Sequence, residues 1–317
     1  MEKMIAVDWG TSSLRAALLG PQGRVLEEQS SHEGILQVAP GEFPAVLRRI
    51  CEGWVDGPAG DAPLVLMSGM VGSRQGWQEA SYCPCPAGFE DVAGALSWVA
   101  GGAGAPSLKR VGIVPGLSCE HARVNDLLHG RGVPDVMRGE ETQVFGAMAL
   151  LGIDSGLFVL PGTHSKWVRV RAGRIHDFHT FMTGEFYALL RQHSILARTL
   201  PEDDGSFDEA AFLRGVAQAR VSGSLLHAAF SARTLALFDR MDAAAQPSYL
   251  SGLVIGEELR AQPAGALSEP VVVVGSPVLA QRYQLALQER GTHARCVGSE
   301  ATWGGLWAIA QQLETSP

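Results

Sequence analysis

The sequence contains no long hydrophobic run, although 46% of its 317 residues are apolar. A helix that crosses a membrane needs about 18 or more uninterrupted apolar residues, and no window of the chain reaches that length. Met1 leads directly into a predicted strand rather than into a leader with a charged and an apolar region. We therefore expect neither a membrane span nor a signal peptide, and we expect a cytoplasmic protein.

Basic residues and cysteines are also scarce. The 25 Lys and Arg are outnumbered by 33 Asp and Glu, so the net charge is −8. Binding to a nucleic-acid backbone needs a clustered basic face, and we expect no nucleic-acid partner. The five cysteines are an odd number without the spacing of a disulfide framework. Cys83 and Cys85 form the one close pair, and no further ligands follow them at the spacing of a zinc site.

One turn occurs twice in the chain. Residues 7–18 read VDWGTSSLRAAL and residues 160–170 read LPGTHSKWVRV. The two segments share a Gly-Thr pair and a serine two positions further on, at Gly10, Thr11 and Ser13 and, 152 positions later, at Gly162, Thr163 and Ser165. Each turn follows a short apolar run, and a second turn comes a few residues later. We therefore expect two β-hairpins and an internal duplication.

The length also supports two domains, because one hydrophobic core seldom organises more than about 250–300 residues. We place the boundary near residues 151–156, LGIDSG, where a helix is expected to end and the second hairpin to begin. The expected domains are 1–155 and 156–317.

Apolar runs that stop at small residues recur at 5–12, 64–70, 111–118, 157–165 and 271–277. Such runs suit strands buried on both faces of a sheet, and ligand crevices form at the ends of such strands. Helices are expected after the capping box SFDE at 206–209 and over 278–290, which stops at Gly291. The fold class is therefore α/β. Residues 101–106, GGAGAP, are expected to form a surface connector rather than a phosphate loop.

A Gly-Thr-Ser turn between two strands exposes backbone N–H groups and hydroxyls, which suit a phosphate chain. One such turn in each domain would hold a nucleotide triphosphate from both sides. The candidate phosphate-binding residues are Gly10, Thr11, Ser12 and Ser13 in the first turn and Gly162, Thr163, His164, Ser165 and Lys166 in the second.

The two copies differ where the first has Asp8 and the second has Leu160. A carboxylate at the end of a buried strand is costly unless it binds something. Mg²⁺ fits, since it prefers a carboxylate and waters beside substrate phosphates, so Asp8 is expected to bind it through water. The alternative is an aspartate that caps the turn. Arg15 is either a phosphate contact or a solvated strand residue.

These segments resemble the nucleotide signatures of the superfamily that contains sugar kinases, actin and Hsp70. More narrowly, the chain resembles the 2-dehydro-3-deoxygalactonokinase family in five blocks, SGMVGSRQGW at 68–77, VPGLS at 114–118, MRGEETQVFGA at 137–147, LPGTHSKW at 160–167 and FMTGEF at 181–186. The resemblance implies two related ribonuclease H-like (actin-like ATPase) domains with a nucleotide cleft between them. It also implies transfer of a phosphoryl group from ATP to the 6-hydroxyl of 2-dehydro-3-deoxy-D-galactonate, with Mg²⁺.

The resemblance further implies a catalytic base. In sugar kinases of this superfamily the base is usually an aspartate that follows a glycine and opens a helix before the second hairpin. The matching segment, GEETQVFGA at 139–147, offers Glu140 and Glu141 instead. The choice stays open with a preference for Glu140, which directly follows Gly139. The other glutamate would favour the N-terminal dipole of the helix.

The late segment VVVVGSP at 271–277 is implied to bind adenosine through Gly275 and Ser276, where many relatives have two glycines. The acceptor would meet Ser68, Gly69 and Met70 and two residues of the loop that follows. Arg74 is expected to bind its carboxylate, because a guanidinium group pairs with a carboxylate through two hydrogen bonds. Trp77 would pack on its carbon chain or, alternatively, fill the domain surface.

Three alternatives remain from the sequence. A non-catalytic ATP-binding protein like actin would share the hairpins but would not need segment 68–77. A sugar-responsive repressor would need a DNA-binding segment, and none is expected before the first hairpin. A kinase for another sugar or sugar acid is the strongest alternative. The expected partners are a small sugar acid and ATP, with a homodimer as a possibility.

Overall fold

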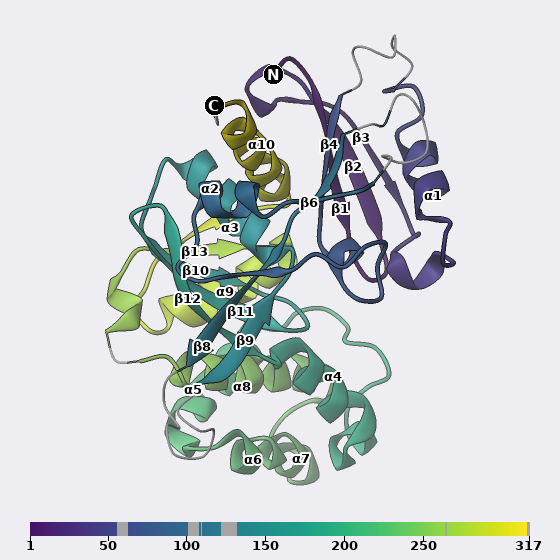
Figure 1. Cartoon of the computed structure of the whole chain (residues 1–317). Coiled ribbons are helices and arrows are strands. Elements are labelled where there is room, and N and C mark those ends of the chain that lie inside the picture. Colours follow the sequence, from purple (N-terminus) through teal and green to yellow (C-terminus); the bar gives the residue numbers. More distant parts are fainter. Residues whose placement is uncertain (56–62, 101–107, 109, 122–131, 264, 316–317) are drawn as a thin grey trace. The chain divides into compact units, whose positions relative to one another are not determined.

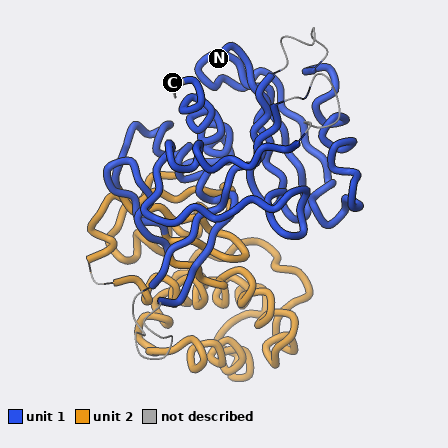
Figure 2. The backbone as a smooth tube through the Cα atoms, viewed as in Figure 1, with its two compact units in different colours: residues 1–155, 168–178, 297–317 blue, residues 156–167, 179–296 orange. Residues whose placement is uncertain are grey.

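The computed structural model describes residues 1–55, 63–100, 108, 110–121, 132–263 and 265–315. The expected connector at 101–106 lies outside these residues. The chain divides into two compact units (Figure 2): unit 1 contains Met1–Ser155, Val168–Phe178 and Val297–Pro317, and unit 2 contains Gly156–Trp167 and His179–Cys296. The domain boundary at 155/156 stays a prediction, and two later segments group with unit 1.

The first sheet has six strands in the order β3-β2-β1-β4-β7-β6 (Figure 1). Its strands are β1 (Met4–Trp9), β2 (Leu14–Leu19), β3 (Val25–Ser31), β4 (Leu64–Ser68), β6 (Ser97–Trp98) and β7 (Val111–Ile113). The pairs β1–β2 and β2–β3 are antiparallel, whereas β1–β4 and β4–β7 are parallel. The first predicted hairpin is therefore confirmed, and its turn lies at the same edge as the end of β4.

The described residues of unit 1 also form a small three-stranded sheet and four α-helices. The small sheet has the order β5-β8-β9, with β5 (Tyr82–Pro84), β8 (Gly116–His121) and β9 (Val133–Met137). The helices are α1 (Phe43–Ile50), α2 (Phe89–Gly94), α3 (Glu140–Leu151) and α10 (Glu300–Thr315). α1 packs its apolar face on one side of β1, β2 and β4, and α10 contacts β1 and β4 as well. This two-sided cover explains why these strands are continuous apolar runs.

The second sheet has five strands in the order β12-β11-β10-β13-β14. They are β10 (Gly156–Leu160), β11 (Ser165–Arg171), β12 (Arg174–Phe181), β13 (Val271–Val274) and β14 (Ala294–Val297). β10 and β13 are parallel. In each sheet the first three strands of one half lie in the order third, second, first: β3-β2-β1 and β12-β11-β10. A later strand, β4 or β13, then pairs in parallel with the first of them. This shared order supports the predicted duplication.

The helices of unit 2 are α4 (Thr183–His193), α5 (Glu209–Ser222), α6 (Leu225–Ala228), α7 (Phe230–Leu237), α8 (Gln246–Arg260) and α9 (Pro277–Gln288). The predicted helix over 278–290 is confirmed in α9. The predicted capping box at 206–209 is wrong: α5 is capped by Asp208, whose Oδ1 atom accepts a hydrogen bond from the backbone N–H of Ala211 at 2.9 Å. An aspartate at the N-cap satisfies an open helix donor as well as a serine does.

Glycines allow two pairs of helices to approach closely. A Cβ atom at residue 146 in α3 would lie 1.6 Å from the carbonyl oxygen of Ala301 in α10. A Cβ at residue 252 in α8 would lie 2.0 Å from the carbonyl oxygen of Phe212 in α5. Any side chain would therefore force these helices apart.

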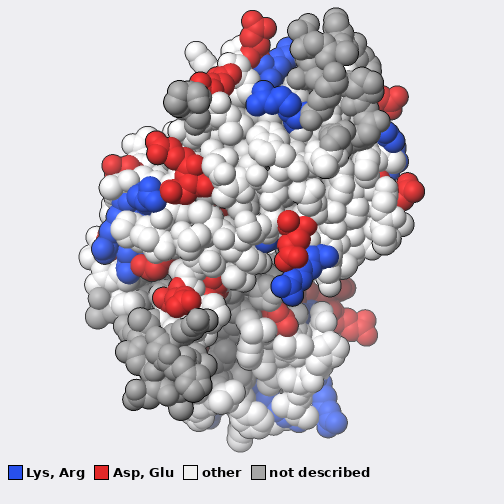
Figure 3. Space-filling view, viewed as in Figure 1, with Lys and Arg blue, Asp and Glu red and all other residues white. Residues whose placement is uncertain are grey.

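The surface agrees with the low charge of the sequence. On the face shown in Figure 3, acidic and basic side chains are interspersed among uncharged ones over the described residues. Within that described part of the chain, none of the helices has the length and apolar character needed to span a membrane.

Candidate active site

The first Gly-Thr-Ser turn connects β1 and β2, and the backbone of residues 34 and 35 packs against it. Within the turn, the Gly10 N–H donates to the carbonyl of Ser13 at 2.9 Å, and the side chains of residues 11–13 are exposed. The Ile35 N–H donates to the Gly10 carbonyl at 3.0 Å. A Cβ at residue 34 would lie 2.4 Å from the backbone of Ser12, so only glycine fits there. The turn is therefore held rigidly while its hydroxyls face outward.

Asp8 and Arg15 lie opposite each other in the same hairpin. Arg15 Nη2 is 2.6 Å from Asp8 Oδ2, and both side chains are about a quarter exposed, at 24% for Asp8 and 27% for Arg15. The Arg15 guanidinium also lies over the Trp303 ring, 5.4 Å from its centroid. Arg15 therefore orients the Asp8 carboxylate, a contact that the sequence did not reveal.

The side chains that could ligate a metal ion near Asp8 limit the kind of ion that could bind there. In the described residues, no group of three or more His, Cys, Asp or Glu side chains could hold a metal ion. A single half-buried carboxylate does not form an all-protein cage. It does fit Mg²⁺, which keeps several waters and takes its remaining ligands from substrate phosphates.

Ser68 is the last residue of β4, and Gly69 and Met70 follow it, next to the end of β1. Ser68 is fully buried, and its Oγ lies 2.8 Å from Thr142 Oγ1 in α3. Gly69 has a φ of 95°, and a Cβ there would lie 2.9 Å from the Trp9 carbonyl oxygen. A Cβ at residue 139 would lie 3.3 Å from the Gly69 Cα. The two predicted blocks 68–77 and 137–147 therefore meet at their glycines.

Arg74 and Trp77 occupy different environments within one loop. Arg74 is 87% exposed, and its Nε lies 3.0 Å from Glu79 Oε1. Trp77 instead stacks on Phe43, with ring centroids 6.2 Å apart and an interplanar angle of 16°, and packs against the core of unit 1. Trp77 therefore has a packing partner in the core of unit 1, and its contact with the substrate stays a prediction.

Arg138 is a second cationic side chain beside segment 68–77. Its Nη2 donates to the Ala80 carbonyl at 2.8 Å, and its guanidinium lies 4.4 Å from the Tyr82 ring centroid. Its Nε and Nη1 atoms are buried and have no hydrogen-bond partner among the described residues. A Cβ at residue 72 would lie 3.0 Å from Nη1, so Arg138 adjoins the 68–77 block directly.

The two candidate bases differ in burial. Glu141 is fully buried, and its two carboxylate oxygens accept from the Gly139 N–H at 3.0 and 2.7 Å. Thr142 Oγ1 adds a hydrogen bond at 3.2 Å. Burial, together with the neighbouring Glu140 carboxylate, raises the pKa of Glu141 to about 8, against the lowering effect of these hydrogen bonds. Glu140 is half-buried and accepts from the Arg138 N–H at 3.0 Å.

The second Gly-Thr turn connects β10 and β11. Thr163 and His164 are exposed, and His164 Nε2 lies 2.6 Å from Glu185 Oε2. Ser165 is fully buried, and Lys166 is 5% exposed with its Nζ donating to Thr180 Oγ1 at 2.8 Å. Both residues already belong to β11, so the structure does not place these two predicted phosphate ligands on the exposed turn.

The start of α4 packs against this second turn. A Cβ at residue 184 would lie 2.5 Å from the Gly162 carbonyl oxygen, and the Glu185 N–H donates to the Thr163 carbonyl at 3.1 Å. The block at 181–186 therefore supports the turn in the way that residues 34–36 support the first.

The segment predicted to bind adenosine lies beside the second turn. Gly275 and Ser276 follow β13, and Ser276 is the N-cap of α9. A Cβ at residue 275 would lie 3.5 Å from Pro161 Cδ. A cavity of about 70 Å³ opens beside Pro161. Its lining comes from the turn and from α4, α8 and α9: Pro161, Gly162, Thr183, Gly184, Tyr187, Ser251, Val254, Ile255, Leu279, Arg282 and Tyr283.

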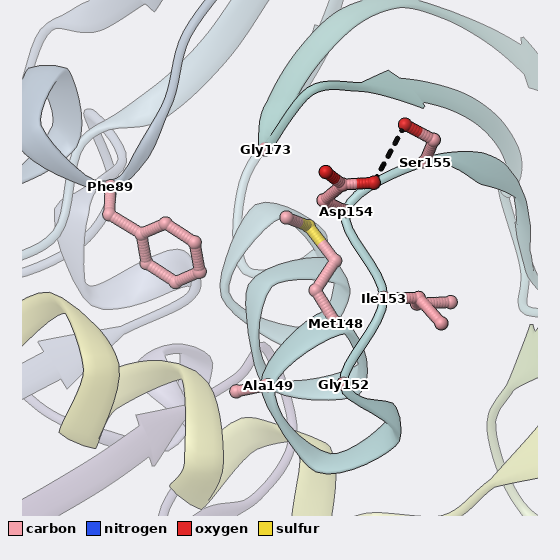
Figure 4. Close-up of a pocket in the computed structure, with 8 residues that line it drawn as sticks. All are labelled: Phe89, Met148, Ala149, Gly152, Ile153, Asp154, Ser155 and Gly173. Atoms are coloured by element: carbon pink, nitrogen blue, oxygen red, sulfur yellow. Dashed lines mark hydrogen bonds between the residues drawn. The ribbon is translucent and has the colours of Figure 1, made fainter.

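A larger pocket of about 630 Å³ in unit 1 contains none of the predicted residues (Figure 4). Phe89 from α2 and Met148 from α3 line it together with Asp154, whose Oδ1 accepts a hydrogen bond from Ser155 Oγ at 3.0 Å.

The two sheets share one strand order, in which the Gly-Thr turns follow β1 and β10, and the predicted α/β fold class of the ribonuclease H-like (actin-like ATPase) type is confirmed. The chain belongs to the 2-keto-3-deoxy-galactonokinase family, which matches residues 8–309. The narrower family resemblance is therefore confirmed as well.

Two relatives are similar over almost their full length. A Rhizobium meliloti protein described as a probable 2-dehydro-3-deoxygalactonokinase is 39% identical over 314 residues, which cover 97% of this chain and 96% of the relative. The Escherichia coli 2-dehydro-3-deoxygalactonokinase is 35% identical and is covered to 98%, as is this chain. A crystal structure of a Sinorhizobium meliloti protein described by the same activity has 38% identity and a TM-score of 0.84, covering 98% of this chain and 99% of that one.

Proposed function

We propose that this chain is an ATP-dependent kinase that phosphorylates the 6-hydroxyl of 2-dehydro-3-deoxy-D-galactonate and forms the 6-phosphate. Family membership over residues 8–309 carries the proposal, because it includes both Gly-Thr turns and the Glu140–Glu141 pair. ATP is the phosphoryl donor of this reaction. A non-catalytic ATP-binding protein is not favoured by these similarities.

The donor half of the site would use the two turns. The first turn, Gly10 to Ser13, offers exposed hydroxyls, and the second offers Gly162, Thr163 and His164. Asp8, oriented by Arg15, would hold Mg²⁺ through water, and the ion would supply charge neutralisation at the phosphates. Gly275 and Ser276 would bind the ribose or the base near the cavity at Pro161.

The acceptor half would use the touching blocks of unit 1. Gly69 and Gly139 bring the loop after β4 against the start of α3, which carries the glutamates. Arg74 is accessible for the substrate carboxylate, and Arg138 adds positive charge beside the loop.

Phosphoryl transfer through a loose transition state needs positioning, charge neutralisation and a base for the acceptor proton. Glu140 is the better base, because Glu141 has no exposed surface and both its oxygens are already used by the backbone. Glu141 then fixes the start of α3.

A coupled assay that follows ADP release tests the function over a panel of sugar acids. We expect turnover with ATP, Mg²⁺ and 2-dehydro-3-deoxy-D-galactonate, loss of turnover with a chelator, and lower kcat/KM for stereoisomers and for neutral sugars. A product with phosphate at the 6-position, identified by nuclear magnetic resonance, completes the test. Higher kcat/KM for another acid would move the proposal to the kinase of that acid.

The cellular setting and the assembly are proposals as well. Use of ATP supports a cytoplasmic location. A homodimer is supported by large apolar side chains that are exposed along the helices of unit 2, namely Met182, Phe186, Leu189, Ile195, Val221, Leu226, Phe230, Leu237 and Phe238. Light scattering on the purified protein measures its mass.

A further inference from the structure

Glu258 in α8 is a buried carboxylate that the proposed reaction does not use. It is 2% exposed, and four side chains donate hydrogen bonds to it. Ser165 Oγ and Trp167 Nε1 donate to Oε1, the serine at 2.7 Å. Thr183 Oγ1 and Tyr283 Oη donate to Oε2, the tyrosine at 2.7 Å.

These four donors are neutral and come from three separate elements. Ser165 and Trp167 belong to β11, Thr183 begins α4, and Tyr283 lies in the middle of α9. Burial raises the pKa of Glu258, while the hydrogen bonds from the four side chains lower it. A buried carboxylate without a paired cation is expensive, and it is retained only where its hydrogen bonds are all made.

Each of the three elements carries a part of the proposed nucleotide site. β11 begins directly after the exposed turn at 162–164. α4 packs on that turn through Gly184 and Glu185. α9 begins at Pro277, directly after Gly275 and Ser276. Thr183 and Tyr283 also line the 70 Å³ cavity beside the turn. The Glu258 carboxylate is therefore the common acceptor that joins the phosphate turn to the adenosine segment.

We propose that Glu258 is a positioning residue of the nucleotide site: its carboxylate fixes the phosphate turn Pro161–His164 relative to α9 and thereby sets the affinity for ATP. The inference rests on the proposed kinase function. It assigns Glu258 no contact with the substrate.

The substitution Glu258→Gln tests the proposal with almost no change in volume. An amide has one acceptor oxygen and presents an N–H₂ group to the other two donors. Because Trp167 Nε1–H can only donate, the amide oxygen must face Trp167. The N–H₂ group then faces Thr183 and Tyr283, whose hydroxyls can rotate to accept from it. We therefore expect the protein to fold with the turn and α9 less firmly joined.

The expected result is a rise of at least about tenfold in KM for ATP, and a similar rise in the Kd for a non-hydrolysable ATP analogue. KM for the sugar acid should stay within about twofold, because the acceptor blocks lie in unit 1. Glu257→Gln is the matched control: Glu257 is the adjacent residue of α8 and pairs with Arg260 at 2.5 Å instead. It should leave both constants unchanged.

A purely structural role would lower the active fraction, and hence kcat, without changing KM for ATP, and this outcome overturns the proposal. Equal rises in both KM values overturn it too. Should Glu258→Gln fail to fold, Tyr283→Phe removes one donor and should raise the Kd for the ATP analogue by a few fold, and an unchanged Kd counts against the proposal. Absence of ATP-dependent turnover in the unaltered protein would instead reject the kinase function itself.

Discussion

Glu140 and Glu141 show how two adjacent identical residues acquire different chemistry. Successive residues of an α-helix point about 100° apart, so the two side chains cannot share one environment. Glu141 turns inward to the Gly139 N–H and Thr142, while Glu140 stays half-buried. Strongly shifted pKa values gather at functional sites, so the raised pKa of Glu141 supports the role proposed for this helix start.

We predict that Glu140→Gln lowers kcat by about two to four orders of magnitude, the range for loss of a general base. Glu141→Gln should retain most of the turnover, because its amide can still accept from Gly139. The matched control is Glu90→Gln, another glutamate in the first turn of a helix, where only the dipole interaction is lost. Steady-state kinetics at saturating ATP measure the difference. The opposite ranking would make Glu141 the base.

A second prediction concerns stability and pH. The folded pKa of Glu141, about 8, is above the ordinary value of 4.5. The folded state therefore holds the proton more tightly than the unfolded state, and its stability contribution is full below about pH 4.5 and is lost as the pH rises to about 8. Glu141→Gln removes this loss. The melting temperature of the variant minus that of the unaltered protein should rise between pH 5 and 8, and a constant difference in calorimetry would contradict the shift.

At the scale of elements, close helix crossings organise both units. α3 is held against α10 at Gly146 and Gly305, and α5 is held against α8 at Gly215 and Gly252. In each case a backbone carbonyl of the partner helix occupies the space of the missing side chain. The crossings bear on the proposed site, because α3 begins with the glutamate pair and α8 carries Glu258.

We predict that Gly146→Val destabilises the protein by about 3 kcal/mol or more, since a Cβ at residue 146 would lie 1.6 Å from the Ala301 carbonyl oxygen and the helices would have to separate. The control is Gly94→Ala at the end of α2, where a Cβ would meet nothing within 4 Å. It should be neutral or slightly stabilising, because alanine favours a helix by up to about 1 kcal/mol. Urea denaturation measures the stability of both variants. Equal unfolding midpoints would show that α3 and α10 can move apart at little cost.

At the scale of the whole molecule, binding of ATP and Mg²⁺ should stabilise the fold. A ligand at about 100 times its Kd adds about 2.7 kcal/mol to the free energy of unfolding, which corresponds to several degrees in melting temperature. We predict that Asp8→Asn removes the part of this shift that depends on Mg²⁺ and lowers turnover by orders of magnitude. Asp239→Asn, at an exposed residue with a φ of 51°, should change neither. If the melting temperature rises equally with Mg²⁺ in the Asp8 variant and in the unaltered protein, Asp8 does not bind the metal ion.

The sequence by itself determined the buried strands β1, β4, β7, β10 and β13, the first hairpin, the α/β class and the family. These features are local: apolar runs of strand length, glycines at turns and short blocks in a fixed order define them without reference to distant residues. α9 followed for the same reason, because its apolar face and its stop at Gly291 are continuous in the chain.

Only the tertiary structure decided which polar residues are accessible. Ser165 reads as a turn residue, yet it is buried because Glu258, 93 positions away, accepts its hydroxyl. Trp77 reads as a loop aromatic, yet it stacks on Phe43. Glu258 itself gives no signal beyond being one of two adjacent glutamates in a helix. Burial and hydrogen-bond partnership depend on residues that are far apart in the chain, and a local pattern carries no information on them.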